Sequence, residues 1–430
     1  MLDILNNYRS ACGWFDAIYA EGESLPISFR NNHIYSIIGR QSSGFGIRAN
    51  KETKTGFSYS NVPSRINETV RRAISLTRFG EKEEFHVPSA VPALQFEPYS
   101  DTIHTFSADR EIEQAEAVIG RIVSAFPRAT VDMGVGKSAG QRRICNSNGI
   151  DCAYRHSSYS VSISATLVSS DGLRLSISEG VSSLGPGNYT NTVDRLLWKL
   201  EHAQTIRTIE SGKIPVVFTP KACASLVGIV ASGLSARNVA KGISPFAGKL
   251  GEALFNSHFS LDDRPLIVES PHSYPFDDEG IQARNKTLIH NGAIAGFISD
   301  LKYAHRLGIE PSGNGSRGYS SLPAPSFSNI VIGAGERPFA EIIGGIKAGI
   351  LVDQFIGLGQ SNTITGHFSA NLDCAYLILN GEITGRVKDC MIADNLFSLL
   401  ADDMETSSDC LWYGSVYSPY LFFPAINFTA

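Results

Sequence analysis

The sequence predicts a multidomain α+β fold, in which an N-terminal region of antiparallel strands and flanking helices precedes a β-rich C-terminal part. Three observations carry this prediction. Residues 160–178 alternate apolar and small polar side chains on both sides of Asp171-Gly172, which is typical of an antiparallel hairpin. Segments with apolar residues at three- and four-residue spacing flank that hairpin and indicate helices. After Gly242 the chain is rich in short apolar runs separated by tight turns, including two Asn-Gly pairs.

The first part of the chain contains strands, a helix and a linker. Short strands joined by polar turns are expected over residues 14–60, and a helix over 68–78 that stops at Gly80. Charged residues and three prolines then favour a linker at 86–106. A helix capped by Ser107 follows, with an apolar stripe along one side.

The later elements complete the predicted domain division. Helices are expected at 192–204, 223–236, 300–307 and 338–348, and a strand at 214–220. These elements predict an N-terminal α/β domain at 1–85, a linker at 86–106, a middle helix–hairpin–helix domain at 107–210 that packs with the first, and a β-rich domain at 211–430.

Composition restricts the class of protein. The chain has 430 residues, of which 43% are apolar and 18% charged, so a packed globular protein is expected. A net charge of −5 without a basic run argues against nucleic acid as a partner. Seven cysteines, without a CxxC pair, indicate reduced thiols and a cytoplasmic location. The N-terminus shows no signal-peptide pattern, and no membrane segment is expected.

The segment CASLVGIVASGLSA, residues 223–236, is unusual because it contains only aliphatic and small side chains. It contains no charged residue and no aromatic side chain. On a helix, one face is broadly apolar, whereas the other contains only Ala, Ser and Gly. Two glycines inside a helix cost about 1 kcal/mol each relative to alanine, so their presence needs a reason.

No catalytic motif is visible in the residues alone. No two of the ten histidines lie within five residues of each other, and the serine-nucleophile and phosphate-loop motifs are absent. The Gly-rich segment 312–318, with Gly313, Asn314 and Arg317, has two interpretations: a loop that holds a peptide or an anion, or a turn between a helix and a strand. The carboxylates of 276–280 are expected at a solvated turn rather than at a cation site.

Several blocks of the sequence resemble the TldD/PmbA family. They are GFGIRANKETKTGFSYSN, SPFAGKLGEALF, the long block from FDDEGIQARNK to SFSNIVI, and ITGHFSANLDCAYLILNGEITGRVKDCMIADNL. Their order and spacing are more specific than any single motif. The resemblance implies an N-terminal α/β region, a C-terminal β-rich domain that is barrel- or sandwich-like, and cytoplasmic dimers around a large cavity.

The resemblance also implies where a metal site would lie. The TldD branch is a zinc metallopeptidase that trims unfolded peptides, with a HExxxH helix and a C-terminal cysteine as ligands. In this chain that frame falls near Gly228, Ile229 and Gly233, and Cys410 is the candidate for the third ligand. The histidines and the glutamate are missing, so neither a metal nor another cofactor is expected. The chain therefore resembles the PmbA branch, also called TldE.

Two functions remain open from the sequence. The first is a non-catalytic subunit that pairs with a TldD-type peptidase and helps to enclose unfolded peptides; a homodimer is the other assembly considered. The second is a stand-alone regulatory or binding protein of the DNA-gyrase-modulator type, without peptidase activity and without direct contact to nucleic acid or a membrane.

Overall fold

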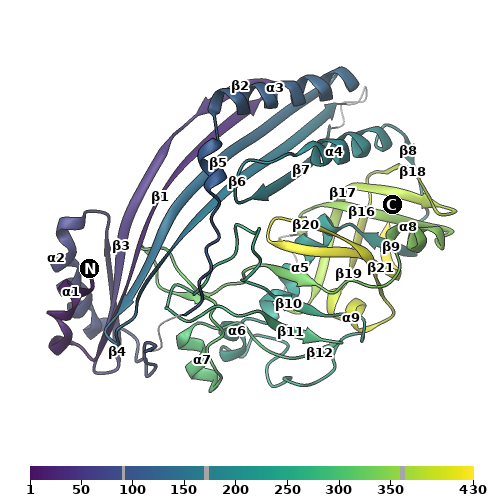
Figure 1. The fold of residues 1–430 in the computed structure, drawn as a ribbon. Coiled ribbons are helices and arrows are strands. Elements are labelled where there is room, and N and C mark those ends of the chain that lie inside the picture. The colour runs from purple at the N-terminus through teal and green to yellow at the C-terminus, as the bar shows by residue number, and fades with distance from the viewer. Residues whose placement is uncertain (90–92, 169–173, 359–363) are drawn as a thin grey trace.

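The fold was analysed in a computed structural model that describes residues 1–89, 93–168, 174–358 and 364–430. The predicted α+β class is confirmed. The predicted Asp171-Gly172 turn and part of the predicted linker lie outside the described residues. Figure 1 shows a long, curved sheet from the N-terminal half that arches over the C-terminal half.

The arching sheet is antiparallel, and its described strands follow the order β4-β3-β1-β5-β6-β7, with β2 paired to β1. The predicted hairpin is β6–β7, in which Val161 lies opposite Val181. Strands from both predicted N-terminal domains belong to this one sheet, whereas the domain boundaries themselves stay a prediction. The strands are β1 (Trp14–Arg30), β2 (His33–Ile37), β3 (Arg40–Lys51), β4 (Lys54–Ser60), β5 (Ala129–Asn146), β6 (Asp151–Val168) and β7 (Arg174–Ser183).

The two faces of this sheet differ in chemistry. Alternate residues of β5 and β6, such as Val131 and Ile163, are buried in a core with helices α3 (Ala108–Ala125) and α4 (Thr190–His202). The opposite face holds small polar residues, and Ser160 and Ser162 are exposed. Apolar residues alternate with serine in the sequence because successive side chains of a strand point to opposite faces, one buried and one exposed.

The C-terminal half is built on a second sheet, in which β9 pairs with β16 on one side and β21 on the other. Its described strands are β8 (Ile206–Arg207), β9 (Gly212–Phe218), β10 (Leu261–Asp263), β11 (Lys286–His290), β12 (Ala293–Ile294), β15 (Ile330–Ile332), β16 (Ala348–Ile356), β17 (His367–Leu379), β18 (Glu382–Val387), β19 (Met391–Asn395), β20 (Glu405–Tyr413) and β21 (Val416–Thr429). A small separate pair consists of β13 (Gly315–Ser316) and β14 (Ala324–Pro325).

The helices pack on these sheets and mostly lie where the sequence predicts them. They are α1 (Leu2–Asn6), α2 (Ile66–Leu76), α3 (Ala108–Ala125), α4 (Thr190–His202), α5 (Pro220–Gly233), α6 (Ala236–Ala240), α7 (Leu301–Leu307), α8 (Phe339–Gly344) and α9 (Leu396–Ala401), with 3-10 turns at Arg9–Ala11, Pro63–Arg65, Thr77–Phe79 and Asp101–Thr105. No described helix combines the length and the apolar character that crossing a membrane requires.

Helices α2 and α4 lie two residues earlier than predicted, and α8 and α5 end earlier. Helix α8 ends at Gly344 rather than at residue 348, because Ala348 already begins β16. Helix α5 ends at Gly233, and the chain turns into the short α6 instead of continuing to Ala236. The first turn of α5 follows the usual rules: Thr219 accepts a hydrogen bond from the Ala222 amide as N-cap, and a proline occupies the first helical position.

Candidate functional site

Helix α5 lies between the second sheet and the surface, with its apolar face in the core. Leu226, Val227 and Val230 are buried, together with Cys223 at the start of the helix. On the other face, Ser225 and Gly228 are exposed. A Cβ atom built on Gly228 would meet no atom within 4 Å. The small face of the helix is therefore open to solvent at this point.

Position 233, in contrast to position 228, has room only for glycine. A Cβ atom at this position would lie 2.3 Å from a carbon of the Phe246 ring, so only glycine fits without movement of that ring. Ile229, where the family frame places the glutamate, is buried, with only 2% of its surface exposed. The space for the second imidazole of a HExxxH frame is thus filled by Phe246, and the position of the general base by a core isoleucine.

Replacing each of the two glycines of α5 with alanine should therefore have opposite effects on the stability of the protein. Gly228→Ala should stabilise the protein by up to about 1 kcal/mol, because alanine favours a helix and nothing hinders its methyl group. Gly233→Ala should destabilise it by about 1–3 kcal/mol, because the methyl group would overlap Phe246. Urea unfolding of both variants measures the difference. Equal effects would contradict the packing described for Gly233.

Cys410, the candidate third ligand, lies on β20 opposite Pro419 of β21. Its thiol is partly buried. Burial, together with the nearby Asp409 carboxylate, raises the pKa of Cys410, which disfavours the thiolate form needed for metal binding or nucleophilic attack. Over the described parts of the chain, no group of three or more His, Cys, Asp or Glu residues is placed to hold a metal ion.

A cavity of about 490 Å³ opens beside the first turn of α5. Its walls are largely aromatic, and Trp198 and Trp412 are both partly exposed. The Phe339 and Tyr420 rings stack in this wall, with centroids 4.0 Å apart. The aromatic side chains that line the cavity are Trp198, Phe339, Tyr376, Trp412, Tyr413 and Tyr420. Such a surface suits apolar groups, and most small-molecule sites have this character.

Two lysines and two carboxylates lie at the bottom of this cavity. The Lys199 ammonium contacts Glu179 at 2.5 Å and Asp353 at 2.6 Å. Burial alone would lower the pKa of Lys199, but the carboxylates of Asp353 and Glu179 raise it above its ordinary value. Lys221, on α5, donates to the Ser178 carbonyl of β7 and to Gln354 of β16, and burial lowers its pKa. These contacts join the edge of the arching sheet to the second sheet.

The predicted Gly-rich loop has an internal role. Gly313 has a left-handed backbone, with φ of 73°. Asn314 is 1% exposed and donates to Asp263 and to the Ser326 carbonyl. Arg317 is 3% exposed and contacts Asp16 at 3.2 Å. The side chains of Asn314 and Arg317 contact other parts of the protein. These contacts do not support a role of the loop in binding a peptide or an anion, which stays a prediction.

The expectation of a solvated turn at 276–280 is wrong. Asp277 and Asp278 are at most 6% exposed, and Glu279 is fully buried. Asp278 contacts Arg142 of β5 at 2.8 Å, and its carboxylate accepts a hydrogen bond from the Arg317 amide. Cationic side chains from distant segments pair with Asp278 and Glu279, whereas the Asp277 carboxylate accepts hydrogen bonds from the amides of Glu279, Ile281 and Gly315. No local charge pattern reveals these partners.

One buried ion cluster links the arching sheet to the C-terminal half. Arg48 of β3 contacts Asp16 of β1 at 2.5 Å and Glu279 at 2.7 Å. Arg317 contacts the same Asp16 carboxylate. Burial alone would raise the pKa of Asp16, but the charges of Arg317 and Arg48 lower it below its ordinary value. Sequence reasoning did not find this cluster, because its members are separated by up to 301 residues.

Comparisons with known proteins agree with this architecture. Residues 211–430 match the PmbA/TldA metallopeptidase C-terminal domain, residues 15–77 match domain 1, and residues 101–200 match the central domain. The chain belongs to the PmbA/TldD family. The resemblance seen in the sequence is thereby confirmed.

Relatives in the PmbA/TldD family extend over nearly the whole chain. A protein of Methanothermobacter thermautotrophicus named metalloprotease is 25% identical, and the match covers 94% of this chain and 90% of that protein. The crystal structure of TldE from Thermococcus kodakarensis has a TM-score of 0.90 at 23% identity, with complete coverage of both chains. A Thermotoga maritima structure, described as a candidate modulator of a DNA gyrase, has a TM-score of 0.89 at 23% identity, again with complete coverage. At this sequence identity, the two structures show that this chain shares their fold.

Proposed function

We propose that this protein is a non-catalytic subunit of the TldE type, which pairs with a TldD-type zinc metallopeptidase and helps to enclose unfolded peptides in the cytoplasm. One observation carries the proposal. Helix α5 offers Gly228, Ile229 and Gly233 where the family frame has His, Glu and His, and Phe246 fills the space next to Gly233. Without two imidazoles and a general base, the Lewis acid and the proton acceptor of zinc hydrolysis are both missing.

Three further observations support this role. The exposed serine face of the arching sheet and the open small face of α5 present few groups that would hold a peptide tightly. The aromatic cavity near Lys221 offers a place for apolar side chains of an unfolded chain. The free cysteines of the described chain suit a reducing compartment, which supports the cytoplasmic location.

The proposal is tested by measuring zinc content and peptidase activity of the protein alone and together with a TldD-type partner. We expect neither stoichiometric zinc nor cleavage of an unfolded peptide by the protein alone, and stable complex formation with an active partner. The control is the same complex in which the partner's zinc-binding histidines are replaced, which should be inactive. Stoichiometric zinc in the protein alone, together with peptide cleavage by the protein alone, would refute the proposal.

The second candidate is a stand-alone binding protein of the gyrase-modulator type, and the description of the Thermotoga maritima structure favours it. The two candidates differ in assembly. A homodimer that never exchanges subunits with a TldD-type partner in size-exclusion chromatography would favour the second, whereas heterodimer formation would favour the first.

A further inference from the structure

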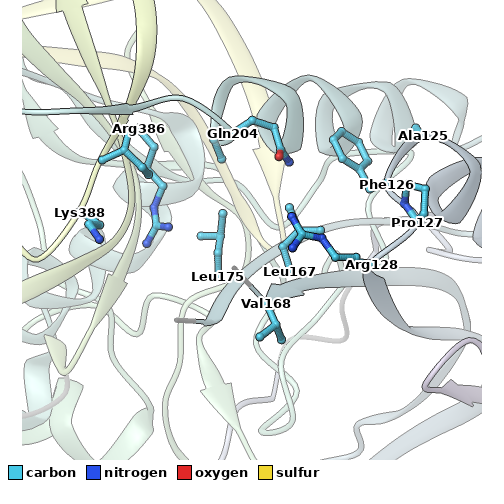
Figure 2. A pocket seen from close by; sticks show the side chains of 12 residues that line it. Ala125, Phe126, Pro127, Arg128, Leu167, Val168, Leu175, Gln204, Arg386 and Lys388 are labelled. Carbon is cyan, nitrogen blue, oxygen red and sulfur yellow. The ribbon is translucent and has the colours of Figure 1, made fainter. Parts of the chain in front are cut away.

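The cavity beside α5 is distinguished by the aromatic side chains of its wall. A different cavity, of about 400 Å³ at the C-terminal turns of α3 and α4, has one aromatic ring among its described lining residues, that of Phe126 (Figure 2). The cavity beside α5 has six, and two of them, Trp198 and Trp412, are 38% and 40% exposed. Contacts between aromatic rings add to the burial of apolar area, so this wall favours an aromatic ligand.

The buried end of this cavity holds a hydrogen-bond acceptor without a donor. Asp353 lines the cavity and is 1% exposed. Its Oδ1 atom accepts hydrogen bonds from Lys199 at 2.6 Å and from the Thr219 hydroxyl at 3.0 Å. Its Oδ2 atom is buried and has no hydrogen-bond partner among the described residues. A buried acceptor without a donor is costly, so a ligand that brings a donor to Oδ2 gains binding free energy.

The nearby lysines do not supply that donor. The Lys221 ammonium lies 3.7 Å from Oδ2 of Asp353, beyond hydrogen-bond distance. It donates instead to the carbonyl and the hydroxyl of Ser178 on β7 and to Gln354 on β16, and these three acceptors match its three N–H groups. Lys199 donates to Oδ1 of Asp353 and to Glu179. Oδ2 is therefore left for a group from outside the chain.

The charges around Asp353 favour a neutral donor. The described lining residues include three acidic and three basic side chains, so the wall as a whole is balanced. The ammonium groups of Lys199 and Lys221 already lie 2.6 and 3.7 Å from the oxygens of Asp353. The N-terminal turn of α5, which also borders the cavity, adds partial positive charge. These groups would repel a cation, although the aromatic faces alone would attract one.

We propose that this cavity binds a tyrosine side chain of a peptide, with the phenol ring against the aromatic wall and the hydroxyl group donating to Oδ2 of Asp353. The donor of tyrosine is at the far end of its ring, where it can reach a deeply buried carboxylate. A phenylalanine ring would leave Oδ2 unpaired. The inference rests on the proposed function for the source of the ligand, an unfolded peptide, and it specifies which side chain this cavity receives.

The experiment compares three peptide-like probes, each titrated into the full chain without a peptidase subunit. N-acetyltyrosinamide carries the hydroxyl group, N-acetylphenylalaninamide lacks it, and N-acetylargininamide carries a cation. Binding is followed by calorimetry at about pH 7, where a phenol is neutral. We expect the tyrosine probe to bind about tenfold or more tightly than the phenylalanine probe, because only the phenol can donate to the buried carboxylate. The arginine probe should bind more weakly than the tyrosine probe.

Variants locate the binding. Trp412→Ala should weaken the tyrosine and phenylalanine probes alike, by about tenfold, because one ring of the wall is lost. Trp412 is 40% exposed, so its truncation leaves the core packed. Tyr35→Ala, which removes a ring of β2 that is 61% exposed, is the matched control and should leave binding unchanged. The comparison of probes in the wild type tests the acceptor without any change at the buried Asp353.

The tyrosine site and the subunit role can fail separately. Equal binding of the tyrosine and phenylalanine probes, tighter binding of the arginine probe, no binding of any probe, or unchanged affinity in Trp412→Ala would each overturn the tyrosine site. None of these results depends on a TldD-type partner. Binding of the tyrosine probe without complex formation would instead reject the subunit role and leave the site in place.

Discussion

Replacement of Arg48 by methionine should destabilise the protein by about 3–5 kcal/mol. The guanidinium of Arg48 contacts the carboxylates of Asp16 and Glu279, and both carboxylates are fully buried. Methionine has a similar length but no charge. Among the described residues, Glu279 would lose the cation in contact with it, and Asp16 would retain only Arg317. The cost is large because an unpaired buried charge pays the desolvation penalty without the compensating attraction.

Denaturant unfolding measures this effect, and Arg121→Met is the matched control. Arg121 contacts Asp194 at 2.6 Å, a distance close to that of the buried pairs, but half of each side chain is exposed. Exposed pairs contribute at most about 1 kcal/mol, so the control should differ little from the wild type. If both variants lost the same small amount of stability, the buried cluster would not hold the two halves together as described.

The stability of the protein should decrease as the pH rises from about 4 to about 8, by on the order of 3 kcal/mol. Two groups are responsible: Asp300, which is 1% exposed, and Asp277, whose pKa is raised to about 8 by burial and by the charge of Glu279. Burial, and next the charge of Glu279, raise the pKa of Asp300 to about 7, against the smaller opposing effects of Arg48 and Lys302. The folded state therefore keeps protons that the unfolded chain releases above the ordinary pKa of these groups. This stabilising contribution is complete below about pH 4 and is lost as the pH rises through about 7 and about 8.

Asp300→Asn separates the titration of Asp300 from the structural role of the residue. Asp300 is the N-cap of α7 and accepts a hydrogen bond from the Tyr303 amide at 2.7 Å. Asparagine caps helices equally well but carries no charge. Urea unfolding at pH 4 and at pH 8 should show equal stability of variant and wild type at the lower pH, and a more stable variant at the higher pH. A wild-type profile that is flat over this range would refute the assignment.

Local patterns predicted the elements that depend on neighbouring residues. The hairpin of β6 and β7 follows directly from alternating apolar and serine residues, because the pleat of a strand sorts them onto two faces. The apolar face of α5 was likewise visible as a helical spacing that places Leu226 and Val230 in the core. Both features are set within a few residues, so one sequence is enough to predict them.

Features that depend on distant residues were not predictable in this way. The run Asp277-Asp278-Glu279 is typical of a solvated turn. Its burial depends on arginines of β3 and β5, which pair with Glu279 and Asp278, and on backbone amides that donate to Asp277. Similarly, the absence of a side chain at Gly233 has its cause in Phe246, thirteen positions later and across a turn. Neither partner is marked by spacing or composition.

The position of β21 has a consequence for the order in which the protein is made. This strand, the last described along the sequence, pairs with β9, β15, β19 and β20. During synthesis, β9 and β16 emerge long before this partner exists, and one edge of β9 stays unpaired in the meantime. An unpaired apolar edge invites pairing with other chains. The growing polypeptide therefore passes through a stage at which chaperone protection matters most, and the sheet is complete only after β21 has been made.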